Sequence, residues 1–158
     1  VEIKGSVVSS SKIRELINNG EIALANEMLG RAYTISGTVV PGANRGGVLG
    51  FPTANIEFSD ADLIVPAKGV YAAKVQISDI EHLGMANIGY NPTFGDIDKK
   101  RLEINIFDFT DDIYGKEIIV RLMHYIRGER KFSSPAELSE QIQMDKDIIS
   151  AYFNEEEN

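Results

Sequence analysis

The chain has 158 residues, of which 43% are hydrophobic, and this is enough to build one globular domain around a single core. Its 24 acidic residues outweigh 16 basic residues, and the net charge of −8 argues against broad electrostatic binding to nucleic acid or to an anionic membrane. It contains no cysteine, which excludes disulfides and thiolate metal sites, and no stretch resembles a signal peptide or a membrane span, so we expect a soluble, cytoplasmic protein.

Two short helices are predicted near the N-terminus. A serine at position 10 or 11 can cap the first helix, which Gly20 ends. The second covers residues 21–29 and ends at Gly30.

From residue 33 onward, the hydrophobic period changes from helical to alternating, which is typical of strands. Turn-forming stretches such as PGANRGG, PAKG and DDIYGK separate the strands. Strands and helices do not alternate along the chain, which argues against a parallel sheet. The predicted strands cover residues 33–39, 53–58, 70–77, 83–89, 102–107 and 117–126. We therefore predict a mainly β fold, a six-stranded antiparallel barrel of Greek-key type with a C-terminal helix and short N-terminal helices.

The C-terminal helix has the clearest start signal. Ser134 is in the N-cap position, Pro135 is in the first helical position and Glu137 completes a capping box. The apolar stripe expected to face the barrel consists of Leu138, Ile142, Ile149 and Tyr152.

Thr53 and Asn55 are two positions apart in Phe-Pro-Thr-Ala-Asn, so in an extended chain both side chains point to the same side. Their neutral oxygens are suited to a hard cation such as Mg²⁺, whose other ligands would be water and ATP phosphates. Taken alone, the pair is explained more simply by a strand-opening Pro-Thr and a solvated asparagine.

The run PGANRGGVLG matches neither the P-loop nor the dinucleotide motif. Gly42, Gly46 and Gly47 would let the main chain approach phosphates, and Arg45 would add a local cation. An ordinary flexible turn explains these glycines more simply when they are considered alone.

In LEINIF, Glu103 and Asn105 alternate with apolar residues. A carboxylate beside a nucleotide is suited to accept a proton from a substrate hydroxyl, although a single strand glutamate is more often just solvated. Arg127 in YIRGERKF is suited to an anionic or aromatic ligand, and a surface charge cluster is the ordinary explanation.

Taken together, these stretches resemble riboflavin kinase, specifically the kinase module of the bacterial bifunctional riboflavin kinase/FAD synthetase. Across residues 30–150, the matching segments occur in the family's order: GRAYTISGTVVPG, LGFPTANI, PAKGVYAAKV, ANIGYNPTFG, LEINIFDFTDDIYGK and IRGERKFSSPAELSEQIQMD. The resemblance assigns residues 30–158 to the kinase domain. Residues 1–29, which contain VSSSKIRELI, look like the tail of an adenylyltransferase domain, whose His-x-Gly-His motif does not occur in this sequence. We therefore expect no FAD synthesis from this chain alone.

The resemblance implies transfer of the ATP γ-phosphate to the ribityl 5′-hydroxyl of riboflavin, giving FMN and ADP. It implies that Glu103 is the catalytic base, that Thr53 and Asn55 hold Mg²⁺, and that Arg127 and Phe132 lie near the flavin. The implied ATP-binding residues are Gly42, Arg45, Gly46, Gly47, Thr53 and Asn55. The partners would be these substrates and an adenylyltransferase domain in a full-length protein, with no nucleic acid and no membrane.

Two departures from the family pattern motivate an alternative. Asn105 occupies a position where the family commonly has histidine. Gly47 occupies a position where the family often has a basic residue after a glycine. The alternative is a catalytically silent flavin- or nucleotide-binding barrel. A third hypothesis, a nucleic-acid interaction module, is opposed by the acidic balance and by the absence of an aromatic and basic stripe.

Overall fold

The computed structural model describes residues 2–3, 6–7, 10–40, 53–60, 62–90, 100–109 and 111–157. A short hairpin that the sequence did not predict, β1 (Glu2–Ile3) and β2 (Ser6–Val7), precedes two helices, α1 (Ser10–Asn18) and α2 (Ile22–Leu29). Gly20 and Gly30, which end the two helices, have positive φ angles of 83° and 76°. Glycine adopts this left-handed conformation without strain, and the predicted helix ends are therefore those observed.

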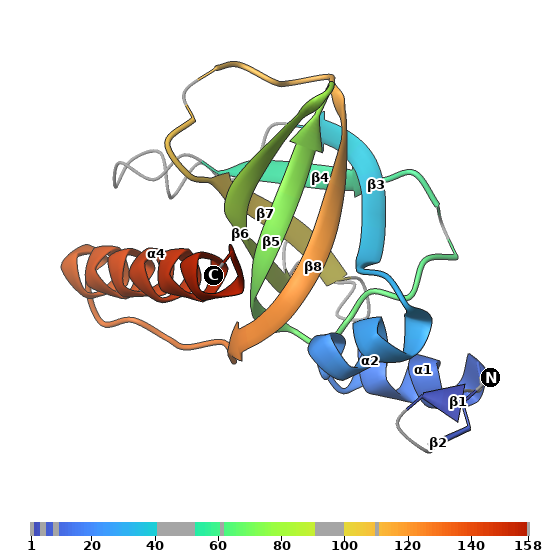
Figure 1. Ribbon diagram of the computed structural model, residues 1–158. Coiled ribbons are helices and arrows are strands. Elements are labelled where there is room, and N and C mark those ends of the chain that lie inside the picture. Colours follow the sequence, from blue (N-terminus) through green and yellow to red (C-terminus); the bar gives the residue numbers. More distant parts are fainter. Residues whose placement is uncertain are drawn as a thin grey trace.

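Six antiparallel strands form the predicted closed barrel (Figure 1). In chain order they are β3 (Tyr33–Val40), β4 (Ala54–Phe58), β5 (Gly69–Ile77), β6 (Ile80–Tyr90), β7 (Lys100–Ile106) and β8 (Glu117–Arg127). Around the barrel they are ordered β3-β4-β7-β6-β5-β8. β5, β6 and β7 form a meander, and β8 returns to pair with β5, which is a Greek key.

Apolar side chains fill the barrel, and α1 and α2 cover one end of it (Figure 1). Leu16, Ile17, Ile22 and Ala25 from these helices belong to the same hydrophobic core as the strand residues. Asn26 fixes α2 to the barrel, because its side chain donates to the Leu122 carbonyl at 2.7 Å and accepts from the Tyr33 N–H at 2.7 Å. The helices and the barrel are thus one packed unit.

The long helix α4 (Pro135–Glu157) lies along the side of the barrel (Figure 1). Ile149 and Phe153 pack on β5 residues Val70 and Ala72, with Ile142 and Tyr152 at the edge of this cluster. Tyr71, which lies between Val70 and Ala72, points the other way, into the barrel core. β5 is therefore buried on both faces, by α4 on the outside and by the core on the inside. Phe153 was missing from the predicted stripe, and the predicted Leu138 is not part of the cluster.

Ser134 caps α4 as predicted, whereas the Glu137 carboxylate, expected to complete a capping box with Ser134, bonds to Ser133 instead. The Glu137 N–H donates to the Ser134 hydroxyl at 3.2 Å, while the Glu137 carboxylate accepts from the Ser133 hydroxyl at 2.6 Å. The pKa of the Glu137 carboxyl is lowered, chiefly by its hydrogen bond from Ser133 and also by the Arg130 guanidinium, whose Nη2 lies 3.0 Å from Glu137 Oε1.

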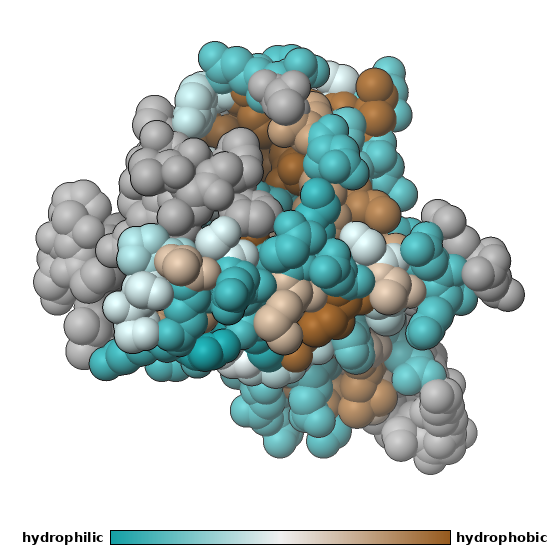
Figure 2. Space-filling view, turned by 90° about the vertical axis from the view of Figure 1, so that its left-hand side faces the viewer, coloured by the Kyte–Doolittle hydropathy of each residue, from teal (hydrophilic) through white to brown (hydrophobic). Residues whose placement is uncertain are grey.

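The view onto the side where α4 lies shows a mostly hydrophilic surface, with separate hydrophobic areas between the polar groups (Figure 2). None of the helices in the described part of the chain is both long enough and apolar enough to span a membrane.

Candidate active site

Three polar residues from neighbouring strands form one row on the outer face of the barrel. Asn55 on β4 is directly opposite Glu103 on β7, and Glu103 is directly opposite Asn87 on β6. Paired residues on antiparallel strands share a face, with Cβ atoms about 5 Å apart. The residues flanking Glu103, Leu102 and Ile104, point into the core, so all three polar side chains face outward.

Glu103 is only partly exposed, with 19% of its side chain accessible. Arg101, two residues earlier on the same face, brings its Nε atom to 3.4 Å from Glu103 Oε1. The carboxylate of Glu103 is therefore held next to a cation on the outer face of the barrel.

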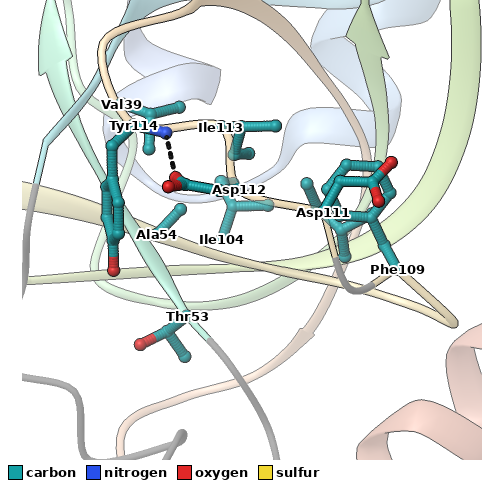
Figure 3. Close-up of a pocket in the computed structure, with 10 residues that line it drawn as sticks. Val39, Thr53, Ala54, Ile104, Phe109, Asp111, Asp112, Ile113 and Tyr114 are labelled. Carbon is teal, nitrogen blue, oxygen red and sulfur yellow. Dashed lines mark hydrogen bonds between the residues drawn. The ribbon is translucent and has the colours of Figure 1, made fainter.

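β4 begins at Ala54, one residue later than predicted, so Thr53 precedes the strand. Thr53 lies beside a cavity of about 240 Å³ (Figure 3). The cavity is lined by Val39, Thr53, Ala54, Ile104, Ile106, Phe109, Asp111, Asp112, Ile113 and Tyr114. Tyr114 and Phe109 lie on opposite sides of this group, and Thr53 lies at its edge, apart from the apolar side chains (Figure 3). A mainly apolar lining with a few polar groups is typical of a small-molecule site.

The polar side of the cavity is a tight turn between β7 and β8. The Tyr114 N–H donates to Asp112 Oδ1 at 3.0 Å, which is the dashed bond in Figure 3. The next residue, Gly115, has a φ of 83° and donates its N–H to the Val39 carbonyl at 2.8 Å. The turn is thereby fastened to β3, and the cavity wall has a defined shape.

Arg127, expected near the flavin, holds α4 against the barrel in this structure. Its Nε and Nη2 atoms donate to the fully buried Asp145 at 2.7–3.0 Å. Phe132 is half-buried, and the Arg130 guanidinium lies 5.2 Å from its ring centroid. Both residues are therefore at the barrel–α4 junction, and the guanidinium of Arg127 is already bound to a carboxylate.

Thr53 and Asn55 are the residues expected to hold a cation. Both residues offer neutral oxygens, and within the described residues no group of three His, Cys, Asp or Glu side chains is arranged to hold a metal. Magnesium commonly takes few protein ligands and shares the phosphates of a nucleotide, which supply the negative charge. The expected ATP-binding residues Gly42, Arg45, Gly46 and Gly47 lie outside the described residues.

Sequence reasoning gave no role to Asn87, Arg101 or Tyr114. Asn87 becomes notable only when the β6–β7 register places it opposite Glu103. The position of Arg101 beside Glu103 is predictable from the sequence, since residues two apart on a strand share a face. Asp112 and Tyr114 were interpreted only as a turn.

Comparison with known proteins places these features in one family. The family model described as "Flavokinase: Riboflavin kinase" matches residues 29–153. The bifunctional riboflavin kinase/FMN adenylyltransferase of Bacillus subtilis is 43% identical over 149 residues, which are 93% of this chain and 47% of that protein. Its Listeria monocytogenes counterpart is 42% identical, over 92% of this chain and 46% of that protein. The chain thus spans about half the length of these curated relatives.

Solved structures agree on the fold. A Streptococcus pneumoniae crystal structure, named as a macrolide-efflux protein, is 38% identical with a TM-score of 0.88, over 95% of this chain and 49% of that one. A riboflavin kinase from Trypanosoma brucei is 23% identical with a TM-score of 0.54, over 77% of this chain and 79% of that one. At that level of identity, the second match shows the barrel fold alone.

Proposed function

Since the chain belongs to the riboflavin kinase family, we propose that it transfers the terminal phosphoryl group of ATP to the ribityl 5′-hydroxyl of riboflavin, giving FMN and ADP. The observation that carries this proposal is the direct pairing of Glu103 with Asn55 on the outer face of the barrel. A carboxylate and a metal-binding amide in adjacent positions are what such a transfer needs.

In the proposed reaction, Glu103 accepts the proton of the 5′-hydroxyl while that oxygen forms its bond to the γ-phosphorus. The bond from the γ-phosphorus to the β,γ-bridging oxygen breaks, and ADP leaves with the electron pair. Phosphoryl transfer depends mainly on alignment and charge neutralisation, and a positioned base adds about 10²-fold to 10⁴-fold.

Thr53 and Asn55 would hold Mg²⁺ together with the phosphates of ATP. When bound, the ion would supply charge neutralisation on the phosphate oxygens. We assign the cavity beside Thr53 to part of the nucleotide, and its apolar lining, which suits a flat ring, and its polar Asp112–Tyr114 side support this assignment. Arg127 and Phe132 remain the proposed flavin contacts, and Gly42, Arg45, Gly46 and Gly47 the proposed ATP contacts.

We further propose that residues 1–29 correspond to the tail of an adenylyltransferase domain, that residues 30–158 form the kinase domain, and that the enzyme works in the cytoplasm. Two observations support this division: VSSSKIRELI resembles the end of an adenylyltransferase domain, and the curated relatives are bifunctional. Because the sequence lacks a His-x-Gly-His motif, FMN and ATP given to this chain should yield no FAD.

The test is direct. The purified chain is incubated with riboflavin, ATP and Mg²⁺, and FMN is separated from riboflavin by chromatography. Steady FMN formation that depends on the enzyme supports the proposal and eliminates the silent-binding alternative. Tight flavin or ADP binding without turnover would instead favour that alternative.

A further inference from the structure

The row that contains Asn55 and Glu103 continues around the barrel to the α4 junction. Asn87 on β6 pairs with Val70 on β5, and Val70 pairs with Arg127 on β8. One line of cross-strand neighbours therefore runs from Asn55 through Glu103, Asn87 and Val70 to Arg127. With about 4.8 Å between adjacent strands, Glu103 and Arg127 are roughly 14 Å apart along this line.

Asn87 lies between Glu103 and the α4 junction in this row, and its side chain is accessible to a ligand. It is exposed, while its neighbours Ala86 and Ile88 are fully buried, so its side chain must face outward. Within the described residues its carboxamide makes no hydrogen bond, whereas Arg127 is bound to Asp145 and Val70 is covered beneath α4. A carboxamide offers two donor hydrogens and one acceptor oxygen, which match the hydroxyl groups of a polyol.

The order of the row indicates which substrate Asn87 contacts. Asn55 is on one side of Glu103, where the proposal above places the metal and the phosphates of ATP. Asn87 is on the other side of Glu103, toward Arg127 and Phe132, the proposed flavin contacts. A five-carbon chain joining a reacting end hydroxyl at Glu103 to a ring near α4 must pass over Asn87.

We propose that Asn87 is a specificity-determining residue whose carboxamide hydrogen-bonds to the hydroxyl groups of the ribityl chain. This inference rests on the proposed riboflavin kinase activity. The contact holds the polyol along the row and brings its terminal hydroxyl to Glu103. It also selects acceptors that carry a polyol over flavins that lack one.

The test compares Asn87→Ala with the parent and with Asn154→Ala, the same substitution at an exposed position on α4. Dissociation constants for riboflavin and for lumiflavin, a flavin with a methyl group in place of the ribityl chain, are measured by quenching of flavin fluorescence. Losing one neutral hydrogen bond should weaken riboflavin binding about threefold to tenfold. Lumiflavin and ADP should bind Asn87→Ala as they bind the parent, and Asn154→Ala should match the parent throughout.

An equal loss of riboflavin and lumiflavin affinity, or unchanged riboflavin affinity, overturns the inference. So does a fall in kcat alone, because that result would mean that Asn87 acts on Glu103 rather than on the polyol. The proposed function is judged separately by FMN formation in the parent, since the affinities do not require turnover. A parent chain that binds no riboflavin overturns both proposals.

Discussion

Glu103 is directly opposite Asn55 on the β4–β7 ladder, and both side chains face outward from a barrel whose interior is apolar. The pairing brings together two residues that are 48 positions apart in the sequence, as the proposed reaction requires. Each strand contributes one chemical group, and the closed barrel fixes their separation because neither strand is a free edge.

Replacing the proposed cation ligands should raise the amount of Mg²⁺ that the reaction needs. For Asn55→Ala and Thr53→Ala, we expect the Mg²⁺ concentration at half-maximal FMN formation to rise about tenfold or more, because each loses a ligand oxygen. The measurement is a Mg²⁺ titration at saturating riboflavin, with Asn154→Ala as the control. A titration midpoint equal to that of the parent would remove these residues from the metal site.

Breaking the Arg127–Asp145 pair should destabilise the fold strongly. In Arg127→Met, Asp145 remains fully buried without its cation, which typically costs about 3–5 kcal/mol in the free energy of unfolding. Urea unfolding followed by circular dichroism measures this cost, and a loss below about 1 kcal/mol would contradict the account. Asp145→Asn provides the matched comparison: if Arg127 also contacts the flavin, riboflavin affinity should fall more in Arg127→Met than in Asp145→Asn.

The cap of α4 should depend on pH. Because the folded pKa of Glu137 is lowered, its contribution to stability is present above its ordinary value of 4.5 and is lost as pH falls through the folded pKa. Glu137→Gln should therefore be less stable than the parent at pH 7, and the difference should shrink below 4.5. Urea unfolding at several pH values checks this, with the exposed Glu140→Gln as the control. A difference that stays constant down to acid pH would refute the linkage.

Gly37 on β3 should not tolerate a side chain. A Cβ atom there would lie 2.5 Å from the Glu57 main-chain oxygen on β4, so one of the paired strands would have to move. We expect Gly37→Ala to lower the unfolding free energy by about 1–3 kcal/mol. Gly115→Ala is the comparison, since a Cβ there meets nothing within 4 Å but the φ of 83° is strained. Urea unfolding measures this change, and an unfolding free energy for Gly37→Ala equal to the parent's would contradict the close approach of β3 and β4.

The architecture was predictable because its signals are local. Alternating hydrophobicity located all six strands, and the Ser134–Glu137 cap located the start of α4. Some strand ends match the prediction and the others differ by one to three residues, as in β6, which starts at Ile80 rather than at residue 83. Phe153 was missed because its burial depends on where α4 crosses β5, which no local pattern records.

The arrangement of the candidate site was predictable only in part, because it is built from long-range register. Thr53 and Asn55 could be placed on one face from their spacing, but their position relative to Glu103 depends on how β4 pairs with β7. The pairing that brings in Asn87 is likewise invisible in the sequence. The Arg127–Asp145 bond joins a strand to a helix 18 residues later, and only packing of that helix on the barrel creates it.

The most direct test of the central claim is the turnover of Glu103→Gln, which keeps the size and polarity of the side chain but cannot accept the proton. Glu57→Gln, the same change at an exposed position on β4, is the control. The account predicts that kcat for FMN formation falls about 10²-fold to 10⁴-fold. Riboflavin and ADP should bind as tightly as they do to the parent, and Glu57→Gln should remain active. A Glu103→Gln variant that phosphorylates riboflavin as fast as the parent would contradict the role assigned to this carboxylate.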